Sequence, residues 1–242
     1  MQKKSLGVIG GMGPMATSVF FEKVIENTVA NSDQEHINMV ILNHATLPDR
    51  TSVILENKEA LFLNAVEKDI RLLEAAGVEH IAIPCNTSHF FYDQMQEMSR
   101  IKIINMIDET CKEIHKRHGD RSKVAILATN GTVRSGIYKQ GCESYNMELH
   151  TPDEVSQEQV MNTIYNIKSD LKVDESVIEK IIKDLVFHEN CCCVILACTE
   201  LSCMNLSDEV MEYCIDAMDV LVEKSIEYSG GIVKNPIKLG KL

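Results

Sequence analysis

The sequence has few basic residues and no long apolar run, and each shortage excludes a class of protein. Its 24 lysines and arginines stand against 36 acidic residues, for a net charge of −12, and they form no basic run. A general nucleic-acid binder needs such runs to contact phosphates. No apolar stretch approaches the roughly 20 residues that cross a bilayer. With 45% hydrophobic and 25% charged residues, the composition is that of a globular protein with neither nucleic-acid nor membrane partners.

A CxxC pair is also missing, although the chain contains nine cysteines. This absence weakens a thioredoxin-like or zinc-ribbon interpretation, and we expect no bound metal. The odd count prevents complete internal pairing. Residues 191–193 are three consecutive cysteines, and neighbouring side chains on a strand point to opposite faces, so they do not indicate a disulfide framework. Free thiols in a reducing cytoplasm are the simplest account.

Short apolar segments alternate with longer amphipathic ones along the chain. We expect strands, some running into a turn, at 6–11, 37–43, 80–86, 101–105, 123–131, 147–151 and 191–199. We expect helices from 14 to about 30, over 56–76 and over 88–98. Two further helices end at about 117 and at about 145. The last three cover 153–168, 173–189 and the stretch from 208 to the glycines at 230–231. Residues 44–54 are expected to be a loop and a candidate lid. Strands that alternate with helices predict βαβ units and a parallel sheet.

The two halves of the chain contain similar segments. LGVIGGMGP at 6–14 matches KVAILATNGTV at 123–133, and IAIPCNTS at 81–88 matches VILACTEL at 194–201. We therefore expect an α/β fold of two pseudo-symmetric halves, each a parallel sheet flanked by helices. The first half comprises residues 1–106 and 208–242, and the second comprises residues 107–207. Ligands of open α/β sheets bind at the carboxyl ends of the strands, so the two halves would share one cleft.

Cys85 and Cys198 end the matching strands, one in each half. Each precedes polar residues that open a helix, where free N–H groups and the helix dipole favour an anion. A thiol in that position can have its pKa lowered from about 8.5 toward neutrality. A single buried cysteine is more often a small apolar side chain, but two in matching positions indicate catalysis. We expect Cys111, Cys142, Cys214 and the three consecutive cysteines to fill space, and we assign Cys203 no role.

The glycine turns favour a carboxylate over a nucleotide. GGMGP at 10–14 lacks the Gly-Lys-Ser/Thr of a P-loop and fails the G-x-G-x-x-G spacing. Missing side chains instead let backbone N–H groups approach an anion closely. TNGT at 129–132 has the same character in the second half. A plain tight turn is the alternative for both.

A few charged residues could serve a substrate or only the surface. Arg50 lies in a loop after a strand and could bind a carboxylate with two parallel bonds, or it could pair with Asp49. Lys168 ends a helix, where a cation is favoured for capping alone. His89 lies four residues after Cys85 and could act as a base, although a structural histidine is the commoner case. Glu200 could orient a neighbour or serve only as an acid in the first turn of a helix.

Together, the segments GVIGGMGPMAT, LPDRT, IPCNTSHFFYD, ATNGTVRSGIY and LACTELS resemble the aspartate/glutamate racemase family, in particular its aspartate racemase-like branch. The resemblance covers residues 7–202. It implies two flavodoxin-like halves with the active site between them, no cofactor, and a homodimer. It also implies that the two catalytic cysteines are Cys85 and Cys198. The substrate-binding positions that it implies are Met12, Arg50, Asn86, Thr87, Thr199 and Lys168.

This resemblance predicts an isomerase that interconverts L- and D-aspartate or glutamate. One thiolate would remove the α-proton while a thiol on the opposite face returns a proton, so the two cysteines must be held in different protonation states. Two alternatives stay open. One is a related enzyme of the same cleft, such as a maleate-type isomerase, a hydantoin racemase or a decarboxylase. The other is a non-catalytic carboxylate-binding protein.

Overall fold

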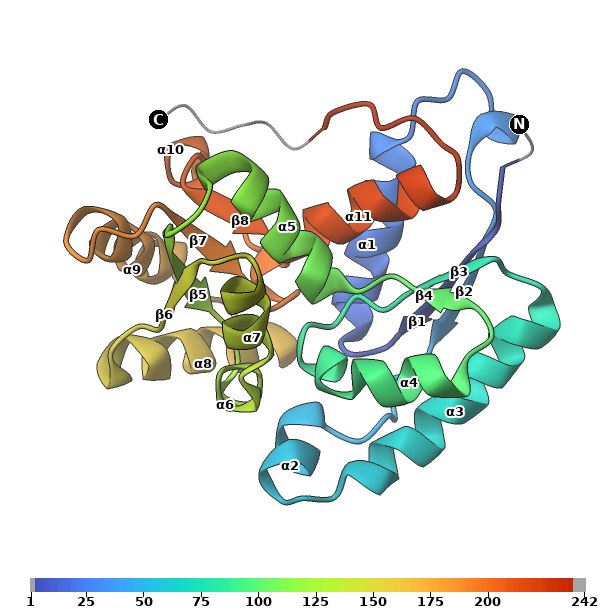
Figure 1. The fold of residues 1–242 in the computed structure, drawn as a ribbon, viewed down its shortest axis with the longest axis horizontal. Helices are drawn as coiled ribbons and strands as arrows, with labels where there is room; N and C mark the ends of the chain where they lie inside the picture. Colours follow the sequence, from blue (N-terminus) through green and yellow to red (C-terminus); the bar gives the residue numbers. More distant parts are fainter. Residues whose placement is uncertain (1–2, 237–242) are drawn as a thin grey trace.

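The computed structural model describes residues 3–236, and two four-stranded parallel sheets lie side by side in it (Figure 1). The first sheet contains β1 (Leu6–Gly10), β2 (Met39–Asn43), β3 (His80–Ala82) and β4 (Lys102–Ile103). The second contains β5 (Lys123–Leu127), β6 (Glu148–His150), β7 (Cys193–Leu196) and β8 (Cys214–Asp216). Their orders, β2-β1-β3-β4 and β6-β5-β7-β8, are the same pattern repeated. The expected fold of two pseudo-symmetric α/β halves is confirmed.

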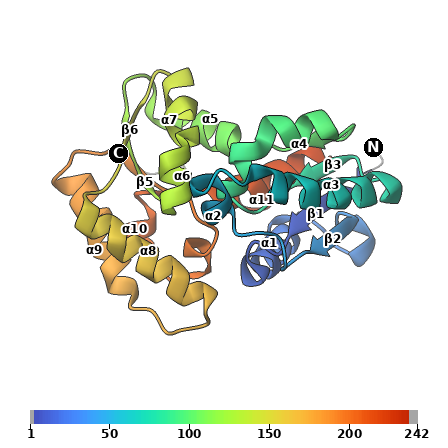
Figure 2. The same cartoon turned by 90° about the horizontal axis from the view of Figure 1, so that it is seen from below.

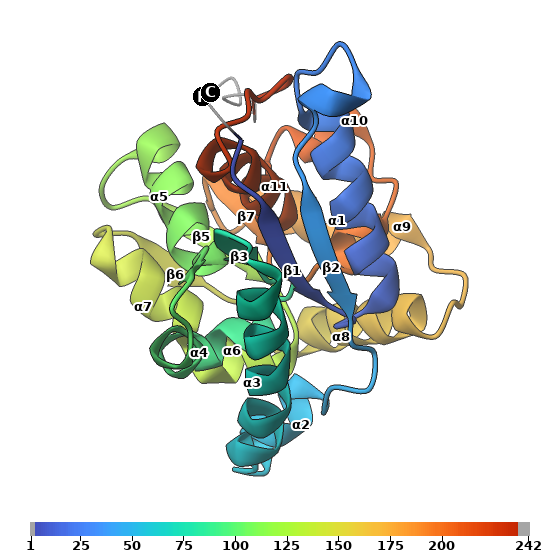
Figure 3. The ribbon, with the colours of Figure 1, turned by 90° about the vertical axis from the view of Figure 1, so that its right-hand side faces the viewer.

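Helices cover both faces of each sheet (Figures 2 and 3). Those between strands of the first sheet are α1 (Pro14–Asn27), α2 (Arg50–Leu55), α3 (Glu59–Ala76) and α4 (Tyr92–Met98), and α5 (Met106–His118) follows that sheet. The later helices are α6 (Asn130–Ser135), α7 (Ile137–Ser144), α8 (Glu154–Lys168), α9 (Glu175–Phe187), α10 (Asp208–Met211) and α11 (Ala217–Tyr228). Short 3₁₀ turns are η1 (Asp33–Glu35), η2 (Thr87–Phe91) and η3 (Leu201–Cys203). No helix of the described chain is long and apolar enough to cross a membrane.

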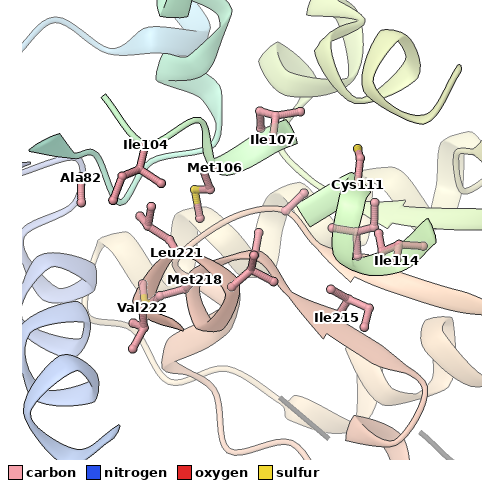
Figure 4. Packing of buried hydrophobic residues seen from close by; sticks show 14 of the residues in the cluster. Ala82, Ile104, Met106, Ile107, Cys111, Ile114, Ile215, Met218, Leu221 and Val222 are labelled. Carbon is pink, nitrogen blue, oxygen red and sulfur yellow. The ribbon is translucent and has the colours of Figure 1, made fainter. Parts of the chain in front are cut away.

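Two helices cross between the halves. Helix α5 follows the first sheet but packs against α7 of the second half, and α11 follows the second sheet but packs against α1 and β3 of the first. The two helices also pack against each other. Figure 4 shows Met218 and Leu221 of α11 near Met106 of α5 and Ile104. One continuous hydrophobic cluster therefore extends from the first sheet to the second, while the outer face of each sheet has a cluster of its own.

The second sheet contains a strand that the sequence did not indicate. We expected one helix from residue 208 to the glycines at 230–231, and the structure instead has α10, the strand β8 and α11. Because β8 pairs with β7, residues 214–216 belong to the second sheet and not to the first half, where the boundary at 208 placed them. Residues 1–2 and 237–242 of that assignment lie outside the described residues. The strand is only three residues long, too short to interrupt an amphipathic pattern visibly.

Three further local expectations were wrong in detail. The loop expected at 44–54 contains the start of α2, which Asp49 caps by accepting from Ser52 N at 2.9 Å. The helix expected up to residue 145 is divided at Gly136, which has a left-handed φ of 71°. The strand expected from 191 begins only at Cys193. The first two differences reflect a capping or turn residue that stops one element and starts another.

Candidate active site

A small cavity lies where the central strands of both sheets end. Its lining includes all eight residues that the sequence singled out as catalytic or substrate-binding. The full lining is Met12, Asp49, Arg50, Thr51, Cys85, Asn86, Thr87, Thr129, Lys168, Cys198, Thr199 and Glu200.

The chain delivers these residues from corresponding positions in the two halves. Met12 follows β1 and Thr129 follows β5, while Cys85 follows β3 and Cys198 follows β7. The turn after β1 requires glycine. Gly11 has a φ of 90°, and a Cβ there would lie 2.3 Å from the backbone carbon of His44. This close passage places Met12, 2% exposed, at the cavity wall.

Cys198 lies beside a carboxylate. Its Sγ donates to Glu200 Oε2 at 2.9 Å, and both side chains are buried. Burial raises the pKa of the Cys198 thiol well above its usual value, the Glu200 charge raises it further, and the Lys168 charge opposes both. We had expected a helix N-terminus to lower this pKa. Only the three-residue turn η3 follows the cysteine, so its effect does not offset burial beside an acid.

Lys168 reaches the cavity from the end of α8 in the second half. Its Nζ lies 4.0 Å from Glu200 Oε1 and 5.3 Å from the centre of the Tyr165 ring. Burial lowers the pKa of Lys168, but attraction to Glu200, Cys198 and Cys85 outweighs burial and holds that pKa above its usual value. The ammonium is therefore positively charged and lies within the field of both thiols.

Arg50 and Asn86 present buried donors with no hydrogen-bond partner among the described residues. Arg50 is 8% exposed, and its Nη1 donates to the carbonyls of Leu47 and Pro48 at 3.3 and 3.0 Å, while its Nε is unpaired. Asn86 Oδ1 accepts from the Tyr138 hydroxyl at 2.6 Å, which leaves its Nδ2 unpaired. The surface pair of Arg50 with Asp49, considered from the sequence, does not form: the guanidinium is buried over the cavity.

A third buried atom of the same cavity, Glu200 Oε1, also lacks a hydrogen-bond partner among the described residues, although the Lys168 ammonium lies 4.0 Å from it. An unsatisfied buried polar group costs about 1–3 kcal/mol, so three of them around one small cavity indicate a polar ligand. Two are donors suited to a carboxylate, and one is an acceptor suited to an ammonium group. An α-amino acid carries both groups on the same carbon, Cα.

Hydroxyl groups join the two halves beside the cavity. Thr87 Oγ1 of the first half lies 3.1 Å from Thr129 Oγ1 and 2.8 Å from Thr132 Oγ1 of the second. Thr51 Oγ1 donates to Thr129 Oγ1 at 3.5 Å. A Cβ on Gly131 would lie 2.7 Å from Thr51 Oγ1, so glycine allows α2 to pack closely on α6. The segment proposed as a lid thus bridges both halves.

The comparisons with known proteins agree with this geometry. A family model described as Asp/Glu/Hydantoin racemase matches residues 9–225. The chain is 30% identical to the broad specificity amino-acid racemase RacX of Bacillus subtilis, over 81% of this chain and 86% of that protein. The structure of Picrophilus torridus aspartate racemase is 33% identical, with a TM-score of 0.83 and coverage of 99% of this chain and 100% of the other.

The chain belongs to the Asp/Glu/hydantoin racemase family. The expected family and its enzyme class, an isomerase of the racemase type, are confirmed. A glutamate racemase from Francisella tularensis, solved with D-glutamate, shares the fold at 16% identity, with a TM-score of 0.59 and coverage of 100% of this chain and 87% of the other.

Two residues considered for this racemase site lie outside the cavity lining. His89 turns toward the backbone, with Nδ1 2.9 Å from the Cys85 carbonyl and Nε2 3.4 Å from that of Ile104. Complete burial lowers the pKa of His89, so its ring has a structural role. Cys203 Sγ donates to the Thr199 carbonyl at 3.4 Å.

Sequence reasoning missed two residues of the lining, Asp49 and Thr51, and named Thr129 only as part of the TNGT turn. The signal for Thr129 was available, because TNGT occupies the position in the second half that GGMGP occupies in the first. Asp49 and Thr51 flank Arg50, but only the fold shows that α2 turns all three toward the cavity.

Proposed function

We propose that this protein is a cofactor-independent racemase that interconverts the enantiomers of aspartate or glutamate through Cys85 and Cys198. One observation carries the proposal: two thiols from corresponding strand ends in opposite halves line one cavity, together with two cations. Inversion at Cα needs a base on one face and an acid on the other, and a two-half scaffold provides that arrangement.

The cavity can bind every polar group of an acidic amino acid. Arg50 Nε, Asn86 Nδ2 and the Lys168 ammonium are donors for its two carboxylates. Glu200 Oε1, which accepts no hydrogen bond from the described residues, is an acceptor for its ammonium group. Met12, Thr87 and Thr199 complete the wall. Because the whole chain carries a net charge of −12, attraction of an acidic substrate must come from these local cations.

Burial beside Glu200 disfavours the thiolate of Cys198, which suits this thiol to the role of the acid. In one direction the Cys85 thiolate takes the α-proton, and the pair of electrons left on Cα spreads into the α-carboxylate. The Cys198 thiol then protonates the opposite face and becomes a thiolate, which Lys168 stabilises. For the other enantiomer the roles exchange. Lys168 and the backbone N–H groups favour the developing dianionic carboxylate over the ground state.

The comparisons support an amino acid as the substrate class. One relative is named an aspartate racemase and another a broad-specificity amino-acid racemase. The buried guanidinium of Arg50 favours a substrate with a second carboxylate, since an unpaired buried cation is costly when a neutral side chain faces it.

We also propose that the protein acts as a homodimer in the cytoplasm. Helix α1 exposes Met15, Phe21 and Ile25 at 62%, 40% and 38%, a surface suited to a second copy. The nine free cysteines require a reducing compartment, because an oxidised Cys85 or Cys198 could not carry a proton. Light scattering of the purified protein should give about twice the monomer mass of 27.2 kDa.

The test is a panel of L- and D-amino acids incubated with the protein in D₂O. We expect the α-proton NMR signal of aspartate or glutamate to disappear fastest, with the opposite enantiomer appearing on a chiral column. Alanine and serine serve as neutral references. Thermal stabilisation by aspartate without deuterium uptake at Cα would overturn the proposal in favour of a binding protein.

A further inference from the structure

A second group of reactive side chains lies at the opposite end of the second sheet. It comprises His118, the last residue of α5, Cys192, which immediately precedes β7, and Cys193, the first residue of β7. Cys198 follows the other end of β7, roughly 20 Å away for six extended residues. The group is therefore separate from the candidate active site.

The two adjacent cysteines face the same side, contrary to our expectation from the sequence. Residues within a strand alternate between faces, but the strand begins only at Cys193 and Cys192 lies in the bend before it. Their Sγ atoms are 4.0 Å apart. One imidazole nitrogen of His118 joins them, and the three atoms all lie within 4.8 Å of one another.

These distances are close to those of a zinc site. A Zn–S bond of about 2.3 Å and a tetrahedral angle place two sulfur ligands roughly 3.8 Å apart. A shift of a few tenths of an ångström would bring the two thiols to that separation. Two thiolates and an imidazole suit Zn²⁺, whereas Mg²⁺ and Ca²⁺ require oxygen ligands.

The three side chains are already arranged in a way that suits a bound cation. The Cys192 thiol donates to Cys193 Sγ across 4.0 Å, so the two sulfur atoms already converge. Cys192 is half-buried and accessible, and Cys193 is 2% exposed. Nδ1 of His118 is buried and has no hydrogen-bond partner among the described residues. A bound metal would displace the proton that the two thiols share.

We propose that His118, Cys192 and Cys193 bind one Zn²⁺ ion, with water or an external ligand in the fourth position. The ion ties the end of α5 to the start of β7. Since α5 enters the second half from the first sheet, this link fixes one of the two helices that cross between the halves. The sequence did not indicate this site, because its ligands form no CxxC motif. Two of them are adjacent and the third is 74 positions earlier.

The experiment measures Zn²⁺ affinity against a chromophoric chelator in the Cys85→Ser/Cys198→Ser variant, so that the thiols of the cavity cannot contribute. We expect one equivalent of tight zinc. Adding Cys192→Ser should weaken binding at least ~100-fold, since even second-shell changes cost 10–100-fold. Adding Cys203→Ser, the matched control at a half-buried cysteine elsewhere, should leave the affinity unchanged.

Cobalt provides a second readout that a non-specific thiol would not give. Co²⁺ in the same background should show thiolate-to-cobalt charge transfer and intense tetrahedral d–d bands, and His118→Asn should weaken the d–d bands while the protein stays folded by circular dichroism. Equal zinc affinity of the background and the Cys192→Ser variant would overturn the proposal. So would an octahedral, weakly absorbing cobalt spectrum.

Discussion

The two halves share a strand order but surround their cysteines differently. Cys198 in the second half donates to a carboxylate, Glu200, and lies beside the Lys168 ammonium. Cys85 in the first half is followed by an amide, Asn86, which the Tyr138 hydroxyl holds. The backbone is pseudo-symmetric while the charges are not. A reaction that moves a proton from one face to the other needs this combination, because the two thiols must stand opposite each other in different protonation states.

The largest expected effect comes from removing either thiol. Cys85→Ser and Cys198→Ser should each lower racemisation at least about 10³-fold, because an acid–base group contributes about 10²–10⁴-fold and a serine hydroxyl does not ionise at neutral pH. α-Proton exchange in D₂O measures the loss. Cys203→Ser is the control and should retain activity. If either serine variant keeps near wild-type turnover, one cysteine alone is sufficient and the two-base mechanism is wrong.

The next effect tests the cation that the first half supplies to the cavity, Arg50. Arg50→Ala should raise KM for aspartate about 10–100-fold, since a hydrogen bond to a charged group is worth about 1.5–3 kcal/mol. For alanine as substrate the change should be much smaller. Arg134→Ala removes an exposed arginine of α6 and should change neither. Equal losses for aspartate and alanine would contradict a role for Arg50 in binding the side-chain carboxylate.

A moderate effect should follow from making the two cysteine sites more alike. Glu200→Gln removes the charge that helps to raise the pKa of Cys198, so that thiolate should form at lower pH. We expect the pH profile for iodoacetamide labelling of Cys198 to shift downward by about one unit, as for the loss of a nearby charge, with Cys85 labelling as the internal reference. Racemisation should fall about tenfold. Glu212→Gln, at an exposed acid, should move neither profile, and an unshifted Cys198 profile would remove Glu200 from the mechanism.

The smallest effect concerns the amide beside Cys85. Tyr138→Phe leaves Asn86 Oδ1 without its 2.6 Å hydrogen bond, which should lower the free energy of unfolding by about 1–3 kcal/mol and turnover only severalfold. Urea unfolding and steady-state kinetics measure the two. Tyr145→Phe loses a solvent-exposed bond to Asp108 and should cost less. A stability loss no larger than that of the control would mean that the Asn86 amide needs no support from the second half.

Features that depend on local pattern were predictable from the sequence. Cys85 and Cys198 each end an apolar run before polar residues, and that pattern alone placed them at strand ends facing one cleft. Their electrostatic surroundings were not predictable in the same way. The raised pKa of Cys198 depends on complete burial beside Glu200, and the contact between Tyr138 and Asn86 joins residues 52 positions apart. Burial and long-range contacts are set by packing, which a linear pattern does not record.

The crossing of α5 and α11 also determines the order in which the protein can be completed during synthesis. The first sheet leaves the ribosome early, but α1 and β3 must wait for α11, at residues 217–228, before their apolar surface is covered. Domains normally fold as units as they emerge. Here the first half keeps an uncovered face until α11 has been made, so a nascent chain that stalls before α11 should depend on chaperones far more than one that includes it.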